Sequence, residues 1–235
     1  MEILKLLSTI DVPISAARIQ GELNLPRSST YHLLAEMVDA GFVAHLPEHK
    51  TYGLGLAAYS MASAYVTQQP LVRMATRDLE QCAALVGGSG HLSRMAGSEI
   101  LYLQEVRAAG ATSLVTEVGV RLQAHKTASG RVMLAHLPDA EVRAAFDTAG
   151  GSGFAALKKR LSLVAARGWD QEIEEITRGQ ASVAAPILDH LDRPAAAVAV
   201  TYPVGTSDTK VDAAIRALLE VSDKVAAKMY RNRKK

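Results

Sequence analysis

The sequence lacks the features that mark secreted, membrane-spanning or zinc-binding proteins. Its 235 residues include a single cysteine, so no internal disulfide can form and the usual cysteine-rich zinc sites are excluded. No run approaches the roughly 20 apolar residues that span a bilayer. The start, MEILKLLSTIDV, places Glu2 and Lys5 in its only apolar run, unlike a signal peptide. We therefore expect a soluble, cytoplasmic protein without metal or cofactor, with Cys82 as a buried structural thiol.

Net charge is also small. Lysine and arginine number 26 against 24 acidic residues, a formal charge of +2, which does not by itself indicate a polyanion-binding protein. Up to residue 55, four basic residues face six acidic ones. Any binding of nucleic acid must then rely on a few well-placed cations or on more than one copy of the chain. Hydrophobic residues make up 49% of the chain, enough for a packed core in one or two domains.

Residues 1 to 55 alternate short helical patterns with turn signals. Ser15 is placed to cap a helix over AARIQGEL, and Asn24 suits its left-handed end. After the turn at Leu25-Pro26, a second helix is expected to end at Gly41. Ser28 or Ser29 would cap this helix, and its core face would carry Thr30, Leu33, Leu34, Met37 and Val38. Two β-runs around a turn at 47–50 follow, so the pattern predicts a winged helix-turn-helix.

The start of the second helix meets the needs of a DNA-reading helix. Small polar side chains there let the free amide groups and the positive end of the helix dipole meet phosphates. Arg27 suits a phosphate or a guanine edge, and Lys50 at the hairpin tip suits a neighbouring phosphate. PRSST is also an ordinary helix N-terminus, so this pattern alone leaves DNA binding open. The predicted contact set is Arg18, Arg27, Ser28, Ser29, Thr30, Tyr31, His32 and Lys50.

Residues 56–70 are rich in small residues and predict a linker helix that stops at Pro70. From residue 71 to the end, β-rich runs alternate with helical patterns, which indicates an α+β domain with an antiparallel sheet. The expected strands are SGHLSRM, EILYLQEV, TSLVTEV, SVAAPILD and PAAAVAVTYP. The expected helices cover 128–137, 139–146, 155–167 and a long final helix, capped by Ser207, that reaches about residue 229.

Several blocks in order resemble the IclR family of bacterial transcriptional regulators. In the first domain these are ISAARIQGELNLPRSSTYHLLAEMVDAGFV and YGLG. GVRLQAHKTASGRVMLAHLP is similar to the family's Gly…His-x-Thr-Ala-x-Gly-basic-x-x-Leu-Ala block, and RGWDQEIEEITRGQASVAAPILD to its Arg-x-Gly…Glu-x-x-x-Gly…Ala-Ala-Pro block. The chain departs from the family at His32, usually arginine, at Ser182, often cysteine, and at Ala199, often serine-like. His32 therefore leaves the operator sequence open, and from Ser182 and Ala199 we expect an effector other than the small oxo-acids that some members sense.

The resemblance implies a winged helix-turn-helix over 1–55, a linker helix over 56–70 and a GAF-like or profilin-like effector-binding domain over 71–235. It implies a small-molecule effector, a near-palindromic operator, a homodimer that pairs into a tetramer, and repression of a catabolic operon. Ser182 and Thr201 suit donation to a carboxylate or carbonyl, which favours a small organic acid or aromatic carbonyl compound as effector. The implied pocket comprises Leu103, Gly119, Val120, His125, Glu172, Ser182, Ala199 and Thr201.

Other interpretations remain open for parts of this set. Glu172 lies in the acid cluster DQEIEE, which most often marks a solvated helix start. His125 suits either a titrating pocket residue or a structural histidine. An enzyme carrying a winged helix would need a nucleophile with a base, but Ser129 in AHKTASGR shows no such partner and suits a helix cap better. A protein-interaction module built on the winged helix is the third alternative.

Overall fold

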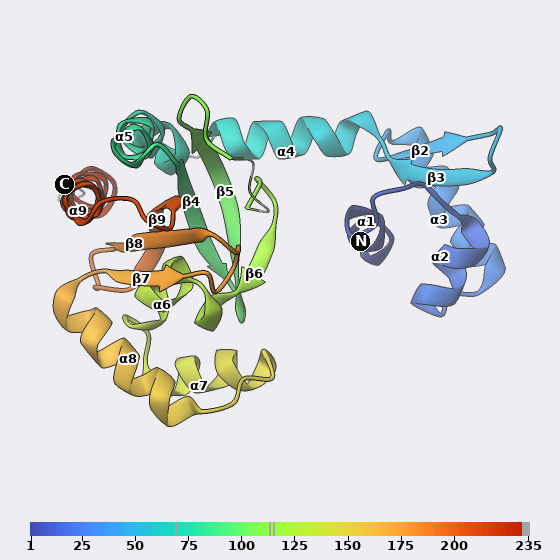
Figure 1. The fold of residues 1–235 in the computed structure, drawn as a ribbon. Coiled ribbons are helices and arrows are strands. Elements are labelled where there is room, and N and C mark those ends of the chain that lie inside the picture. Colours follow the sequence, from blue (N-terminus) through green and yellow to red (C-terminus); the bar gives the residue numbers. More distant parts are fainter. Residues whose placement is uncertain (69, 113, 115, 232–235) are drawn as a thin grey trace. The chain divides into compact units, whose positions relative to one another are not determined.

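The computed structural model describes residues 1–68, 70–112, 114 and 116–231 (Figure 1). The chain divides into two compact units, residues 1–68 and residues 69–235. The mixed helix and sheet content confirms the α+β prediction, with a helix-turn-helix first and an antiparallel sheet second. No helix within the described ranges is long and apolar enough to cross a membrane.

The first unit is a winged helix-turn-helix. Its three short strands pair antiparallel in the order β1-β3-β2. A small core around Ile19, Leu34 and Val43 holds the helices against these strands. The elements are α1 (Glu2–Ser8), β1 (Ile14–Ser15), α2 (Ala16–Leu23), α3 (Arg27–Asp39), β2 (Val43–Leu46), β3 (Thr51–Leu54) and α4 (Leu56–Gln68).

Local signals placed most helix ends of this unit correctly. Ser15 caps α2 and accepts a hydrogen bond from the Arg18 amide, and Asn24 ends α2 with φ +49°. Gly41 follows α3 with φ +73°, as predicted. The predicted cap of α3 is wrong, because the helix begins at Arg27 directly after Pro26. Proline fixes its own φ near −65° and leads into the helix without a side-chain cap.

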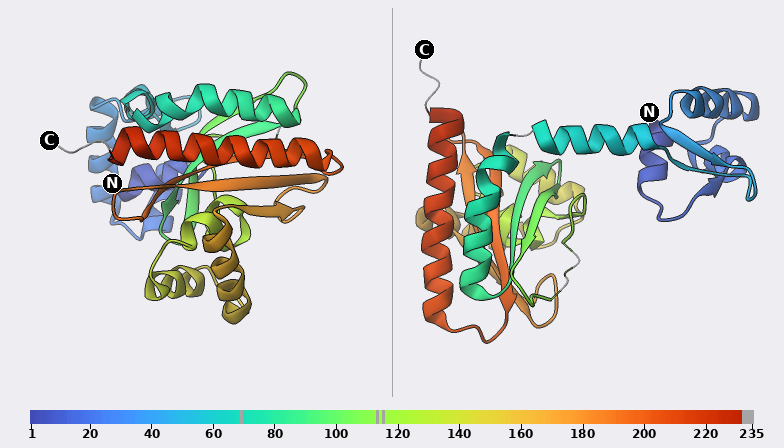
Figure 2. Two further views of the ribbon diagram at one scale, coloured as in Figure 1. Left: turned by 90° about the vertical axis from the view of Figure 1, so that its left-hand side faces the viewer. Right: turned by 90° about the horizontal axis from the view of Figure 1, so that it is seen from above.

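The second unit is a six-stranded antiparallel sheet in the order β6-β5-β4-β9-β8-β7. Helices α5 and α9 cover one face, and α6 to α8 lie on the other (Figure 2). The strands are β4 (Ser89–Ala96), β5 (Glu99–Arg107), β6 (Arg121–Gln123), β7 (Asp170–Ile173), β8 (Gln180–Leu188) and β9 (Pro194–Pro203). The helices are α5 (Pro70–Val86), η1 (Ala124–Lys126), α6 (Ala128–Leu134), α7 (Asp139–Thr148), α8 (Phe154–Arg167), α9 (Asp208–Ala226) and a last π-helical turn η2 (Ala227–Arg231).

Three predictions for this unit are corrected by the structure. Pro70 does not stop a helix but begins α5, while residue 69 lies outside the described residues. The expected strand TSLVTEV is absent at its described positions, and residues 113 and 115 lie outside them. The acid cluster DQEIEE starts not a helix but β7, a strand that the sequence did not predict.

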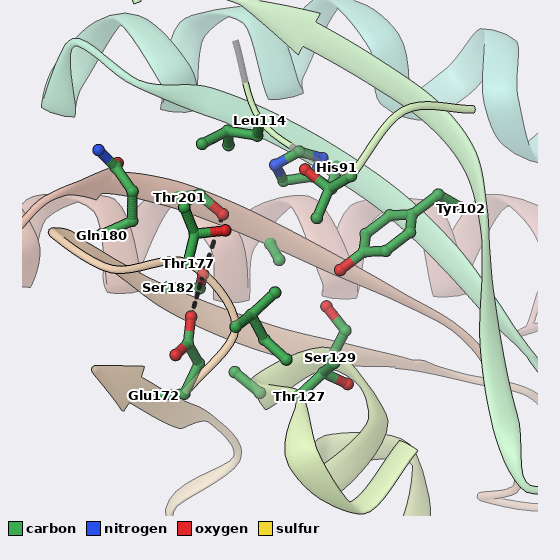
Figure 3. A pocket seen from close by; sticks show the side chains of 14 residues that line it. His91, Tyr102, Leu114, Thr127, Ser129, Glu172, Thr177, Gln180, Ser182 and Thr201 are labelled. Carbon is green, nitrogen blue, oxygen red and sulfur yellow. Dashed lines mark hydrogen bonds between the residues drawn. The ribbon is translucent and has the colours of Figure 1, made fainter. Parts of the chain in front are cut away.

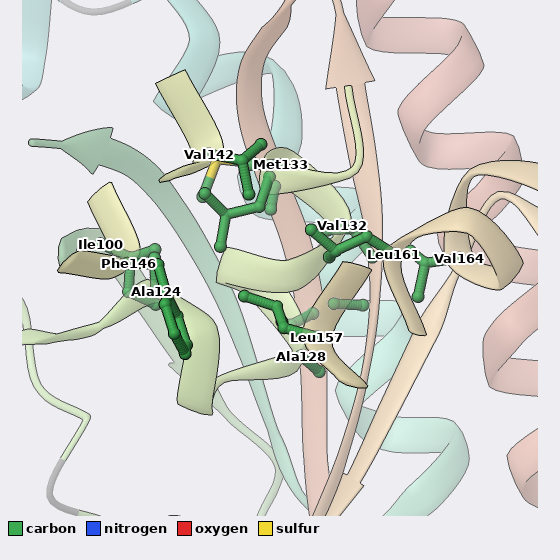
Figure 4. Close-up of a cluster of buried hydrophobic side chains, with 14 of the residues drawn as sticks. Ile100, Ala124, Ala128, Val132, Met133, Val142, Phe146, Leu157, Leu161 and Val164 are labelled. Atoms are coloured by element: carbon green, nitrogen blue, oxygen red, sulfur yellow. The ribbon is translucent and has the colours of Figure 1, made fainter. Parts of the chain in front are cut away.

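The core between the sheet and α6 to α8 gathers apolar side chains from both layers (Figure 4). Val132 and Met133 of α6 are fully buried there, packed with Phe146 of α7 and Leu161 of α8. Gly130 brings α6 close to η1, since a Cβ at this position would lie 2.1 Å from the Ala124 carbonyl oxygen. Any larger residue at 130 would push α6 away from η1.

Candidate functional site

Helix α3 separates a buried face from an exposed one. Thr30 is 0% exposed and Leu34 1%, so both lie in the small core of the first unit. The predicted DNA-contacting residues around Thr30 on the first two turns are solvent-exposed: Arg27, Ser28, Ser29, Tyr31 and His32. The N-terminal end of α3 therefore presents polar side chains and free amide groups to the outside.

Thr30, predicted to contact DNA, is buried in the core and does not belong to this exposed surface. Its hydroxyl donates to the Pro26 carbonyl oxygen at 3.0 Å, which ties the first turn of α3 to the preceding loop. Leu33, predicted in the core, is instead 39% exposed. The buried side of α3 is narrower than the sequence pattern indicated.

The other predicted DNA contacts are exposed cations. Arg18 on α2 lies 3.6 Å from Glu22, an exposed ion pair that is easily exchanged for a phosphate. Lys50 lies in the turn between β2 and β3 with φ +51°. The Arg27 guanidinium lies 5.9 Å from the centre of the Tyr31 ring. All three cations are solvent-exposed in the first unit.

A cavity lies on the α6 side of the larger sheet (Figure 3). Its walls come from five strands, from the start of α6, from residues 114 and 116, and from the connection at 176–177. The volume that the centre of a water molecule can occupy in it is about 20 Å³. This is room for little more than one water molecule, so the walls must move apart before an organic ligand can bind. A second hollow of about 50 Å³ shares Leu114, Gln180 and Thr201 with it. The cavity is lined by His91, Tyr102, Leu114, Thr116, Thr127, Ala128, Ser129, Glu172, Ile176, Thr177, Gln180, Ser182, Ala199 and Thr201.

Strand register creates a row of polar side chains across the cavity floor. Glu172 pairs with Ser182 across β7 and β8, and Ser182 pairs with Thr201 across β8 and β9. The Ser182 hydroxyl donates to Glu172 Oε1 at 2.6 Å and lies 2.9 Å from Thr201 Oγ1. The Glu175 amide donates to Glu172 Oε2 at 2.9 Å. Glu172 is 3% exposed, so the interpretation of its cluster as a solvated helix start is wrong.

A buried ion cluster holds β7 and the Glu172 loop in place. Arg131 on α6 is 1% exposed, and its Nε donates to Asp170 Oδ2 at 2.5 Å. Its Nη1 donates to the His125 carbonyl oxygen at 3.2 Å and to Glu175 Oε2 at 3.0 Å. Arg167 donates to the other Asp170 oxygen. One guanidinium therefore links α6, η1 and β7.

The start of α6 is capped by Thr127, not by Ser129 as the sequence favoured. Thr127 Oγ1 accepts a hydrogen bond from the Gly130 amide at 2.9 Å. Ser129 is then the second helical residue, is buried, and lines the cavity. Ser129 is therefore a residue of the cavity wall and not the cap of α6.

The structure brings together only half of the predicted effector set. Glu172, Ser182, Ala199 and Thr201 line the cavity, whereas Leu103, Gly119, Val120 and His125 do not. Leu103 lies at a register shift between β4 and β5, next to the lining residue Tyr102.

The remaining three of these residues have other structural contacts. The Gly119 amide donates to the Tyr102 carbonyl oxygen and the Val120 amide to that of Glu117. His125 packs edge-on against Phe146 at 5.1 Å, and burial followed by the charges of Lys126 and Arg131 lowers its pKa.

The sequence pattern predicted β4 as a strand, but its residues were not assigned to the cavity, which β4 lines next to β9 in the same sheet. Ser89, His91 and Ser93 alternate along β4 and share one face, a signal that SGHLSRM contained. His91 is 1% exposed, and burial, with a smaller contribution from Arg107, lowers its pKa to about 3. Tyr102 lies edge-on to His91 at 5.4 Å and points its hydroxyl into the cavity (Figure 3). Burial and then Glu172 raise the pKa of Tyr102 above its ordinary value.

Family models match both units. The IclR helix-turn-helix domain matches residues 1–47, and the bacterial transcriptional regulator IclR C-terminal domain matches residues 63–227. The chain belongs to the IclR family. It is a DNA-binding transcriptional regulator with a helix-turn-helix domain and an effector-binding domain, and not an enzyme.

Curated relatives agree with this assignment. The glycerol operon regulatory protein of Streptomyces griseus is 30% identical over 207 residues, which cover 86% of this chain and 82% of that protein. The HTH-type transcriptional regulator XynR of Escherichia coli is 26% identical over 209 residues, 86% of this chain and 83% of that protein.

Solved structures share the fold. An IclR transcriptional regulator from Alicyclobacillus acidocaldarius superposes with a TM-score of 0.83 at 21% identity, covering 96% of this chain and 95% of that one. An IclR homolog from Microbacterium hydrocarbonoxydans, complexed with 4-hydroxybenzoate, gives 0.80 at 20% identity and covers 97% of each chain.

Proposed function

We propose that this IclR-family protein binds operator DNA through α3 and changes its DNA affinity when a small molecule enters the cavity of the second unit. The exposed, polar N-terminal half of α3 is the observation that carries the DNA-binding part. Its residues Arg27, Ser28, Ser29, Tyr31 and His32 face outward, while Thr30 and Leu34 fix the opposite side in the core. Arg18 and Lys50 add two exposed cations for phosphates.

We propose a homodimer on a near-palindromic site, and a tetramer as its further assembly. The first 55 residues hold only four basic side chains against six acidic ones, so a single copy has little charge with which to displace counterions. Helix α4 carries large apolar side chains that are mostly exposed in the isolated chain: Leu56 at 77%, Tyr59 at 70% and Met61 at 60%. Burying them against a second copy would bring two α3 helices to two half-sites.

The response to the effector is proposed to be a population shift. A ligand that fills the cavity selects the arrangement of strands and loops that accommodates it. A useful switch needs a coupling free energy of about 1–3 kcal/mol between ligand and DNA binding. We propose that the protein represses a catabolic operon and acts in the cytoplasm, where that DNA lies. The effector class expected from the sequence is a small organic acid or aromatic carbonyl compound.

A gel-shift assay tests the proposal. Full-length protein at micromolar concentration is mixed with the DNA upstream of its own gene, alone and with each member of a panel of organic acids, carbonyl compounds and alcohols. We expect a shifted band at low salt and release or tightening by at least one compound. Absence of a shift at low salt contradicts DNA binding, and a shift that no compound alters contradicts the ligand response.

A further inference from the structure

The hydrogen bonds on the cavity floor determine the direction in which the hydroxyl groups of Ser182 and Thr201 donate. Ser182 has one hydroxyl proton, and it points to Glu172 Oε1 at 2.6 Å. The contact of 2.9 Å between Ser182 Oγ and Thr201 Oγ1 then requires Thr201 to donate to Ser182. Both hydroxyl protons therefore run toward Glu172. The sequence predicted that Ser182 and Thr201 donate to a carboxylate or carbonyl. In this arrangement both protons are already engaged, so the floor offers lone pairs to a ligand that donates.

The charged groups of the cavity lining also disfavour a carboxylate ligand. Its lining, as far as the structure describes it, contains the carboxyl group of Glu172 and neither lysine nor arginine. Arg107 of β5 pairs with Ser89 of β4 and lies outside the lining. It forms a bidentate ion pair with Glu105. A carboxylate ligand would enter beside a buried acid without a lining cation to balance it.

Strand β4, which pairs with β9 in the same sheet, offers a different group. Neither ring nitrogen of His91 has a hydrogen-bond partner among the described residues, although the side chain is 1% exposed. Buried polar atoms are normally paired, so an unpaired imidazole that lines a cavity indicates a partner that enters it. With its pKa near 3, the imidazole is uncharged at neutral pH and supplies one N–H donor and one nitrogen acceptor.

We propose that the effector is an uncharged, hydroxyl-bearing molecule held between Glu172 and Thr201 on one side and the imidazole of His91 on the other. Its hydroxyl groups donate to the floor, and another of its oxygens accepts from His91. This inference rests on the proposed function, since it names the ligand class of that regulator. It assigns His91 as a specificity-determining residue, and it proposes an uncharged hydroxyl compound in place of the organic acid or aromatic carbonyl compound expected from the sequence.

A negatively charged ligand and a positively charged ligand both fit the cavity less well than an uncharged one. A carboxylate meets Glu172, whose oxygens already accept from Ser182 and from the Glu175 amide. An ammonium satisfies Glu172 but must leave its water shell for a cavity whose other partners, His91 and Tyr102, are uncharged. A hydroxyl group donates one proton to the floor without bringing a charge into the cavity.

Two series of matched probes test this directly, because the members of each series differ mainly in charge. The first is glycerol, glycerate and 3-amino-1,2-propanediol; the second is 4-hydroxybenzyl alcohol, 4-hydroxybenzoate and 4-hydroxybenzylamine. Each is titrated into the full-length protein by calorimetry at neutral pH. We expect the uncharged member of the series that fits to bind at least about tenfold tighter than either charged member.

Three variants localise the effect. In Glu172→Gln, we expect the acid to gain about tenfold in affinity and the alcohol to lose affinity. In His91→Phe, which keeps a ring but removes both nitrogens, the alcohol should weaken. Glu220→Gln, an exposed position on α9, should bind as wild type does. Trp169 fluorescence on heating checks that each variant is folded.

The outcomes separate this inference from the function on which it rests. Tighter binding of an acid or an amine overturns the inference while leaving a ligand-responsive regulator intact, and so does an unchanged preference in Glu172→Gln. Absence of binding by all six probes at millimolar concentration also overturns it. If the alcohol binds as expected but leaves the gel shift unaltered, the ligand class stands and the proposed response of DNA binding fails.

Discussion

At the scale of single residues, Arg131 shows how a buried charge positions the cavity. It contacts Asp170, which is 0% exposed, and the turn that carries Glu175. In Arg131→Leu, Asp170 keeps Arg167 but loses its buried partner, so we expect the free energy of unfolding of the second unit to fall by about 3 kcal/mol. Urea unfolding followed by Trp169 fluorescence measures this loss.

An exposed ion pair provides the control for Arg131. Arg193, directly before β9, contacts Glu141 at 2.7 Å, with both side chains about half exposed. Arg193→Ala should cost about 1 kcal/mol or less. Equal losses in the two variants would show that the buried cluster has no special role.

His91 makes stability depend on pH. Its pKa is about 3 in the folded protein against 6.5 ordinarily, so the unfolded chain takes up a proton at a pH where the folded chain does not. The free energy of unfolding therefore falls as pH drops below 6.5 toward 3, with a slope that approaches about 1.4 kcal/mol per pH unit. In His91→Gln this part of the slope should vanish, as seen in urea midpoints measured between about pH 6 and pH 5.

The matched control lies in the same unit. His190 is exposed, so His190→Gln should keep the wild-type dependence on pH. A slope unchanged by His91→Gln would show that His91 is not the group whose protonation destabilises the fold.

At the scale of elements, α3 gives the clearest prediction. Arg27→Ala should lower operator affinity about tenfold and reduce its dependence on salt by about one phosphate contact. Anisotropy titrations at several salt concentrations measure both quantities. Arg216→Ala, an exposed arginine on α9, should change neither. DNA affinity that is untouched by Arg27→Ala would favour a winged helix that binds protein.

How far the elements could be predicted depended on where their determinants lie. Ser15, Asn24 and Gly41 act within one turn of their own helices, so the sequence placed those ends correctly. β7 was missed because the partners of its buried acidic residues are distant in the sequence: Arg131 lies 39 positions before Asp170, and Ser182 lies 10 positions after Glu172. TSLVTEV has strand-forming residues, but the place beside β5 is taken by β6.

The cavity, like the elements, was predicted only in part. Family resemblance pointed to four of its lining residues, including Glu172 and Ser182. The direction of the hydrogen bonds between Ser182 and Thr201, and the unpaired state of His91, depend on strand register and on burial. Neither can be read from spacing along the chain.

At the scale of the whole molecule, the account requires at least two copies of the chain. We expect a dimer in sedimentation equilibrium, stabilised by the exposed apolar side chains of α4. Tyr59→Glu should shift the equilibrium toward monomer and weaken operator binding, because it places a charge among those side chains. Ser60→Glu, on the neighbouring exposed position, should have a smaller effect. An unaltered dimer in Tyr59→Glu would exclude this surface.

The central claim is that α3 recognises particular DNA. Its most direct test is an anisotropy titration of the full-length protein against a duplex from upstream of its own gene and against a shuffled duplex of identical composition. We expect the genuine sequence to bind about 10³-fold tighter or more at physiological salt. Equal affinity for the two duplexes, or no binding to either at low salt, would contradict the account.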